Sequence, residues 1–380
     1  MRHHNSVLHG VLKHVPWAVF DRLVGQHRAD HRVRRLSTRS QLVAMLYAQI
    51  AGAASLREIE AALESHAARL YHLGARPVSR STLADANARR PHGVFSELFA
   101  YMAGAAGRGL RRAGGDLVRV IDATSLRLSG LAAGWAGGGG AKAHVIYDPD
   151  ADRPLYLAVT PARVNDITPA RAMPIEPGAT YVFDLGYYSF AWWAALDARG
   201  CRWVTRLKRN TPLAVTVESP VPGGGALAYD RIGLLPARLS GMRANPFAAP
   251  VREIGVALDD GRVLRVVTND LDAPADEIAA LYRRRWAVEL FFRWVKQTLK
   301  IRHFVGRSEN AVRLQVAVAL IAYMLLRLAQ KVARVAGSPL AYTRLVRANL
   351  MHPRALDALH QPRAPDPADP RQLTLAFSFS

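Results

Sequence analysis

The feature that most constrains the fold is a set of five strand-like segments between residues 116 and 209, interrupted by only two helical segments. Three strands come first, followed by a helix near Asp166, a strand, a helix that Gly200 closes, and a fifth strand. Strands that alternate with helices in this way predict an α/β fold. The strand-like segments are DLVRVIDATSLRL (116–128), AKAHVIYDPD (141–150), RPLYLAVTPARV (153–164), ATYVFDLGYY (179–188) and CRWVTRLKR (201–209).

The first 112 residues carry helical patterns instead. Ser55 and Ser79 each precede such a pattern as predicted N-caps, and Glu58 completes a capping box three residues after Ser55. We expect an α-helical N-terminal DNA-binding domain over residues 1–112. An ordinary helical bundle with charged faces also fits, because no helix-turn-helix spacing is evident. The helical segments are Ser40–Ala51, SLREIEAALESHAARL from Ser55 and SRSTLADANARR from Ser79.

The rest of the chain is expected to form one large domain, residues 113–351, followed by a tail. Within it, residues 210–265 contain short β-type runs and predict a mostly β insertion. A half-apolar helix over residues 281–300 comes next. Residues 352–380 contain five prolines and predict a Pro-rich C-terminal tail.

The charge balance indicates the class of partner. Lys and Arg total 51 against 30 Asp and Glu, which gives a formal net charge of +21 and favours a polyanionic partner. A membrane surface is the competing polyanion. The apolar run Val316–Leu326 falls short of the roughly 20 residues that span a bilayer, and it predicts a buried helix instead. Nucleic acid is therefore the expected partner.

The N-terminal sequence and the cysteine content bear on the compartment. Lys13, His14 and Pro16 interrupt the first twenty residues before an apolar stretch long enough for a signal peptide can form. Cys201 is the only cysteine, which excludes an intrachain disulfide and a cysteine-based zinc site. We expect a cytoplasmic protein, associated with the nucleoid through its nucleic-acid partner.

Two aspartates stand where apolar strand-like runs end: Asp122 follows LVRVI and Asp184 follows YVF. Either one alone is most simply a strand-end cap or turn residue. In an open sheet with this strand order, the first and fourth strands can be neighbours, which would bring the two carboxylates together. Lys142 and His144, in the second strand-like segment, are expected to be structural.

Glu289 is the third acid of interest. It lies among cations in LYRRRWAVELFFRWVKQTLK, residues 281–300, where a salt bridge is the simplest explanation. At about 100° per residue, Glu289 shares a sector of about 60° with Tyr282, Arg285 and Lys296. Three carboxylates would form the all-oxygen site that Mg²⁺ prefers, and two such ions can promote in-line phosphoryl transfer. The acid would bind metal and the cations would bind phosphates.

The spacing in this helix resembles the YREK signature of DDE transposases from bacterial insertion sequences, in the insertion sequence four family. IDATSLRL, FDLGYYS, WVTRLKRN, VTND and SRSTLADANARR are similar to other blocks of that family. The resemblance covers most of the chain. The signature consists of Tyr282, two residues, Arg285, three residues, Glu289, six residues and Lys296.

The resemblance implies an RNase H-like catalytic core with a mostly β insertion, preceded by the α-helical N-terminal domain. It also implies that Asp122, Asp184 and Glu289 are the catalytic triad and bind two Mg²⁺ ions, for which Mn²⁺ can substitute. Family members that form a DNA hairpin can use an aromatic residue of the insertion to hold a flipped base. The insertion expected here contains no Trp, only Tyr229 and Phe247.

The implied reaction is cut-and-paste DNA transposition. The enzyme would cut DNA at terminal inverted repeats and join the freed 3′ hydroxyls to target DNA. Tyr282, Arg285 and Lys296 would contact phosphates of the transposon end, and a homodimer would assemble on the DNA. The alternatives are an RNase H-like nuclease without strand transfer and a non-catalytic DNA-binding repressor derived from a transposase.

Overall fold

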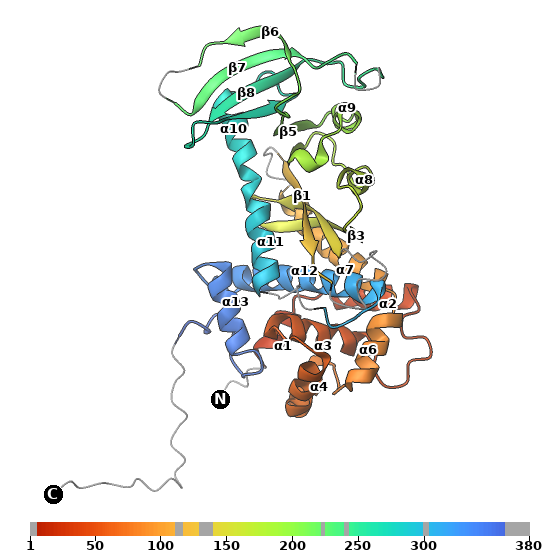
Figure 1. The fold of residues 1–380 in the computed structure, drawn as a ribbon. Helices are drawn as coiled ribbons and strands as arrows, with labels where there is room; N and C mark the ends of the chain where they lie inside the picture. The colour runs from red at the N-terminus through yellow and green to blue at the C-terminus, as the bar shows by residue number, and fades with distance from the viewer. Residues whose placement is uncertain are drawn as a thin grey trace, which may run out of the picture.

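A computed structural model describes residues 6–110, 117–128, 140–221, 225–238, 243–298 and 304–361. Figure 1 shows an upright molecule with a β-rich part at the top, a helical base, and a sheet and long helix between them. Residues from the base and from the sheet belong to one continuous hydrophobic core, so the two parts pack together.

The five predicted strands are all present and occupy one part of a nine-stranded sheet. Their order is β3-β2-β1-β4-β5, in which β2 is antiparallel to its two neighbours and β1, β4 and β5 run parallel. This order confirms the predicted RNase H-like core. The strands are β1 (Val118–Leu126), β2 (Ala141–Asp148), β3 (Arg153–Pro161), β4 (Thr180–Phe183) and β5 (Arg202–Arg206).

The insertion is mostly β, as predicted, and it continues the same sheet. Its last strand pairs with the edge of β5 in antiparallel register, so the order goes on as β9-β8-β7-β6. Pairing in this way satisfies the backbone groups that an open β5 edge would expose. The four strands are β6 (Ala214–Ser219), β7 (Leu227–Leu234), β8 (Val251–Ala257) and β9 (Val263–Thr268).

Alternate residues of the central strands enter two different cores, because successive side chains of a strand point to opposite faces. Val182 packs with the long helices on one face, whereas Tyr181 and Phe183 belong to the second core with Trp192 and Trp193. The second core is covered by α8 (Ile167–Ala170) and α9 (Phe190–Asp197), and the first by α10 (Ala275–Arg284), α11 (Trp286–Thr298) and α12 (Glu309–Val332).

The helical base surrounds α12. This helix packs against the N-terminal helices α1, α3, α6 and α7, because its residues are apolar on nearly all sides. By length and composition it could cross a membrane, yet its most apolar stretch is 83% buried, which agrees with the predicted buried helix. The other helices are α1 (Val7–Leu12), α2 (Trp17–Gln26), α3 (Thr38–Ala51), α4 (Leu56–Ser65), α5 (Ala67–Leu70), α6 (Arg80–Arg89), α7 (Gly93–Leu110) and α13 (Pro339–Ala348).

Side-chain caps begin the N-terminal helices where the sequence predicts them. Ser55 Oγ accepts the Glu58 N–H at 3.2 Å, and Ser79 Oγ accepts the Thr82 N–H at 3.3 Å. The Glu58 carboxylate in turn accepts the Ala54 N–H at 2.8 Å. Each cap satisfies a backbone donor that has no partner within its helix.

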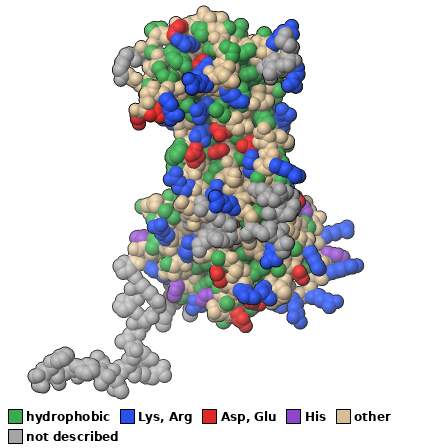
Figure 2. All heavy atoms as spheres, viewed as in Figure 1, with side chains coloured by type: hydrophobic (Ala, Val, Ile, Leu, Met, Phe, Trp, Pro, Cys, Tyr) green, Lys and Arg blue, Asp and Glu red, His purple; other side chains and the backbone are tan. Residues whose placement is uncertain are grey.

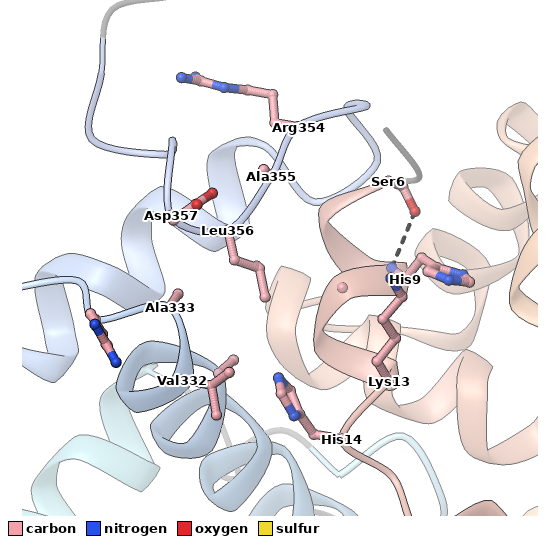
Figure 3. Close-up of a pocket in the computed structure, with 13 residues that line it drawn as sticks. Ser6, His9, Lys13, His14, Val332, Ala333, Arg354, Ala355, Leu356 and Asp357 are labelled. Carbon is pink, nitrogen blue, oxygen red and sulfur yellow. Dashed lines mark hydrogen bonds between the residues drawn. The ribbon is translucent and has the colours of Figure 1, made fainter. Parts of the chain in front are cut away.

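The start of the predicted tail packs onto α1. Pro353 forms a β-bridge with Ser6, and Leu359 is buried. A cavity of about 550 Å³ lies between α1, the end of α12 and residues 354–357 (Figure 3). None of the three predicted catalytic acids lines this cavity. Residues 362–380 lie outside the described part of the chain.

Candidate active site

Asp122 and Asp184 lie side by side on neighbouring parallel strands. Ile121 of β1 is in register with Phe183 of β4, and each aspartate is the next residue along its strand. Parallel strands point the same way, so the two carboxylates meet at the same edge of the sheet. Asp122 sits within β1, whereas Asp184 is the first residue after β4.

Asp122 is a largely buried acid whose negative charge is only partly compensated by its neighbours. Its Oδ1 accepts the Ala123 N–H at 2.7 Å, and 15% of its side chain is exposed. The pKa of Asp122 is raised to about 7, mainly by burial. The charges of Asp184 and Glu289 contribute to the rise, whereas the Ala123 N–H bond and Arg285 oppose it. A cation beside Asp122 would reverse this shift, because it favours the ionised carboxylate.

Asp184 also performs the turn role that its position suggests. Its Oδ1 accepts the Gly186 N–H at 2.8 Å and caps the short 3-10 helix η4 (Leu185–Tyr187). The backbone carbonyl of Asp184 accepts a hydrogen bond from Thr205 Oγ1 of β5 at 3.5 Å. Both contacts hold the carboxylate at the end of β4, so a structural role and a catalytic role are compatible here.

Glu289 reaches Asp122 through one guanidinium. Arg285 Nη2 lies 2.6 Å from Glu289 Oε1, and Arg285 Nη1 lies 3.9 Å from Asp122 Oδ2. The salt bridge that the sequence suggested for Glu289 is therefore present. Since the same arginine also faces Asp122, the pair belongs to the acid site and not to an ordinary solvated helix surface.

The prediction of one helix over residues 281–300 was wrong in detail. The structure divides it at Arg285 into α10 and α11, although Arg285 keeps helical angles of φ −55° and ψ −30°. The Arg285 N–H bonds to the Tyr282 carbonyl and the Val288 N–H bonds to the Arg285 carbonyl, so the spacing is three residues instead of four. This tighter turn moves Tyr282 relative to Glu289.

The other residues of the signature differ in exposure. The Tyr282 ring is buried, with 8% of the residue exposed, and burial raises its pKa. The Arg285 guanidinium lies 5.8 Å from the centre of that ring. Lys296 lies two turns beyond Glu289 on α11 and is half-buried. Thus Asp122, Asp184, Glu289 and Arg285 converge, while Tyr282 supports the arginine from within the core.

The donor set fits a hard divalent cation, because all three acids offer carboxylate oxygens. In the present arrangement Arg285 lies between two of these carboxylates. Among the described residues, no three Asp, Glu, His or Cys side chains are close enough together to enclose an ion. The carboxylate oxygens therefore suit a divalent cation. The Arg285 guanidinium supplies positive charge between Asp122 and Glu289.

Sequence reasoning missed a fourth acid at the same edge. Asp166 Oδ1 lies 2.8 Å from Lys142 Nζ, which also donates to the Val164 carbonyl at 3.1 Å. A Cβ added to Gly186 would lie 3.1 Å from Asp166 Oδ2 and 3.0 Å from Asp184 Oδ1. The two aspartates therefore approach one turn from both sides. Asp166 follows β3, which runs in the same direction as β1. Its position after a strand could therefore have indicated an acid at the same end of the sheet as Asp122.

Two buried polar groups flank this fourth acid. His144 Nε2 bonds to Thr160 Oγ1 at 2.8 Å, and burial lowers the pKa of His144 to about 4, so the ring is neutral and structural, as expected. The Tyr187 hydroxyl is buried and makes no hydrogen bond within the described chain. Burial raises the pKa of Tyr187 well above 10, and the charges of Asp122, Asp166 and Asp184 add to this effect.

The two aromatic residues of the insertion have structural partners. The Tyr229 hydroxyl donates to Glu253 at 2.7 Å, and the Arg231 guanidinium lies 4.4 Å from the Tyr229 ring centre. Phe247 is 3% exposed and packs edge-on against Trp203. Both rings are engaged within the protein.

Comparison with protein families decides the identity of this fold and site. The family model described as the transposase DDE domain matches residues 113–325, which contain all three acids and the arginine. The chain belongs to the DDE transposase family. It is therefore an enzyme that acts on DNA, with the divalent-metal dependence general to that family. A second model, described as a domain of unknown function, matches residues 3–76.

Named relatives of this DDE transposase agree with that assignment. A protein of Sinorhizobium fredii named as a transposase, y4zB, is 41% identical over 305 residues, covering 78% of this chain and 85% of that protein. A protein of Geobacillus stearothermophilus, named as a transposase for insertion sequence element IS5377, is 56% identical over 68 residues, or 18% of each chain. These names place the chain among insertion-sequence transposases and are consistent with the insertion sequence four family.

A solved structure is similar at low identity. It is a piggyBac transposase synaptic complex with hairpin DNA, with a TM-score of 0.46 and 10% identity. The similarity covers 95% of this chain and 83% of that chain.

Proposed function

We propose that this transposase cuts DNA at the terminal inverted repeats of its element and transfers the freed 3′ ends into target DNA. The observation that carries the proposal is the register of β1 and β4. It sets Asp122 beside Asp184, and Arg285 links Asp122 to Glu289. Converging carboxylates can hold the divalent ions that promote phosphoryl transfer.

Asp122, Asp184 and Glu289 would hold the divalent ions, and we propose two Mg²⁺ ions, for which Mn²⁺ can substitute. Bound there, such ions would make the attacking oxygen more nucleophilic and stabilise the leaving oxygen. Arg285 would then exchange its two carboxylate partners for a DNA phosphate. Lys296 would contact a phosphate directly, while buried Tyr282 would position Arg285.

The proposal extends to the organisation of the protein. Residues 1–112 would bind DNA, residues 113–351 would carry out the chemistry, and residues 352–380 would form the tail. Two copies would assemble on paired element ends, because both ends must be held together for transfer. The protein would work on DNA in the cytoplasm, at the nucleoid.

A strand-transfer assay tests this function directly. A labelled duplex with a pre-cleaved terminal repeat and a supercoiled target plasmid are incubated with the full-length protein and Mg²⁺. The expected result is a joined product that requires the 3′ hydroxyl and is lost when Ca²⁺ replaces Mg²⁺. Cleavage of intact ends without any joined product would identify a nuclease instead.

A further inference from the structure

The loop between α2 and α3, residues 27–37, is a strongly basic surface segment away from the acid site. Its sequence, HRADHRVRRLS, contains four arginines and one acid. All four arginines are exposed. Figure 2 shows Lys and Arg side chains projecting from the helical base of the molecule, at its lower right. The arginines of the loop are Arg28, Arg32, Arg34 and Arg35.

The loop is held in one shape. Arg28 and Arg32 have positive φ angles of 48° and 58°, which non-glycine residues adopt only where the surroundings require it. Ala29 is buried and its N–H bonds to the Val24 carbonyl at 2.9 Å. At the other end Leu36 is buried. The guanidiniums therefore project from a preformed support, which reduces the entropy lost on binding.

The single acid of the loop, Asp30, is engaged by the start of α3. Asp30 Oδ1 accepts hydrogen bonds from the backbone N–H and the hydroxyl of Thr38, both at 2.7 Å. These bonds commit Asp30 to the start of α3. Across the described part of the chain, Arg28, Arg32, Arg34 and Arg35 form no ion pair.

The loop and the segment 67–77 form the walls of a cleft. The cleft has a volume of about 580 Å³, and Arg34, Arg35 and Arg76 line it. Tyr71 also lines it and is 84% exposed, the highest value among the exposed large hydrophobic residues described. Three guanidiniums beside an exposed phenol offer several donors to anionic oxygens. Asp30 also lines the cleft, and its Oδ1 is already bonded to Thr38.

The C-terminal end of α6 is packed inside the protein behind this loop. At the end of α6, Arg90 is buried and donates to Gln41 at 3.0 Å and to the Leu36 carbonyl. Asn87 accepts from Gln41 at 2.7 Å. The end of α6 thus supports the loop 27–37 from behind, and the four loop arginines stay exposed.

We propose that this cleft binds the sugar-phosphate backbone of duplex DNA without reading its sequence. Guanidiniums bind phosphates in a bidentate manner, and backbone contacts position a protein on DNA without selecting bases. The site deepens the proposed function, on which it rests. It assigns a role to the N-terminal region that matches a domain of unknown function, residues 3–76.

The test compares two full-length double variants with the same loss of charge. Arg34→Gln with Arg35→Gln removes two guanidiniums from the cleft, and Arg171→Gln with Arg199→Gln removes two exposed ones beside α8 and α9. Fluorescence anisotropy measures binding to a terminal-repeat duplex and to a scrambled duplex of equal length, over a salt series. Thermal melting checks that both variants are folded.

In the loop variant, the slope of log affinity against log salt should become shallower by about 1.8, or about 0.9 for each lost phosphate contact. Affinity for both duplexes should fall by about sixtyfold near 0.1 M salt, as that change in slope implies, and the control variant should match the wild type. A slope equal to that of the wild type would overturn the inference. A loss confined to the terminal repeat would overturn it too, because that result indicates base reading.

The outcome separates this inference from the proposed function. If the wild type cuts and joins DNA while the loop variant binds like the wild type, only the backbone site is wrong. If the wild type neither joins ends nor binds either duplex, the proposed function itself fails.

Discussion

The acid site and the arginine loop differ in the burial of their charged side chains and in whether these have partners within the protein. The carboxylates of Asp122 and Glu289 are mostly buried and share Arg285 within the fold, whereas the loop arginines are exposed and have no described acidic partner. Buried charges need internal partners because leaving water is costly. Exposed charges stay hydrated, so they cost little free energy without an internal partner and are available to bind a polyanion. The contrast separates the proposed catalytic site from the proposed binding surface.

The sharpest way to break this contrast is Glu289→Gln. If Glu289 binds metal, cleavage should fall by about a thousandfold or more, because the isosteric amide lacks the charge that holds the ion. DNA affinity should be unchanged or slightly higher. Gel-based cleavage rates and anisotropy measure both effects.

A matched control exists on α12. Glu309 lies 2.7 Å from Arg313 in another pair with four-residue spacing, but away from the other acids. Glu309→Gln should leave cleavage nearly unchanged, because an exposed pair contributes at most about 1 kcal/mol. Rapid cleavage by Glu289→Gln would show that Glu289 only forms an ion pair with Arg285 and does not bind metal.

The second prediction concerns the stability of the metal-free protein. The folded pKa of Asp122 is raised to about 7, so the protonated form is favoured on folding. The contribution of Asp122 to the free energy of unfolding should be most favourable below about pH 4, and it should decline as pH rises from about 4 to 7. The cost is at most about 4 kcal/mol.

Asp122→Asn should remove this cost and the associated pH dependence, while abolishing cleavage. Thermal melting in EDTA at pH 5 and pH 8 measures the difference. Added Mg²⁺ should stabilise the wild type at pH 8 and leave the variant nearly unaffected. A variant that melts lower than the wild type at pH 8 in EDTA would show that the acid is not strained.

Asp166→Asn tests whether Asp166 contributes to the acid site. The change leaves Lys142 without its anionic partner beside the turn that holds Asp184. Cleavage should fall by about tenfold, the scale on which groups surrounding a metal site act. The Mg²⁺ concentration for half-maximal cleavage should rise, and DNA affinity should hold.

Asp150→Asn is the control, because Asp150 pairs with Arg284 at a more exposed position. Titrations of cleavage rate against Mg²⁺ give the comparison. An unchanged titration for Asp166→Asn would confine Asp166 to a structural role.

The smallest effect is expected for Lys296→Ala. Loss of one phosphate contact should weaken binding of a cut end several-fold, roughly threefold to tenfold, and make its salt slope shallower by about 0.9. Joining should slow, while cleavage persists at high enzyme concentration. Lys331→Ala, at the exposed end of α12, should behave like the wild type in the same anisotropy and joining assays.

Local sequence patterns determined the elements and the identity of the acids. Alternating and apolar runs predicted all five core strands, and the ends of two of these strands pointed to Asp122 and Asp184. Ser55 and Ser79 cap helices where predicted. Such features depend on side chains a few residues apart, so they can be read directly from the chain.

Tertiary structure alone decided how distant segments meet. It joined the insertion to β5, placed α12 inside the N-terminal helices, and brought Lys142 and Asp166 together beside Asp184. It also divided the predicted helix at Arg285, where the contacts to Asp122 and Glu289 are made. These arrangements depend on burial and pairing between residues far apart in the chain, which no local period encodes.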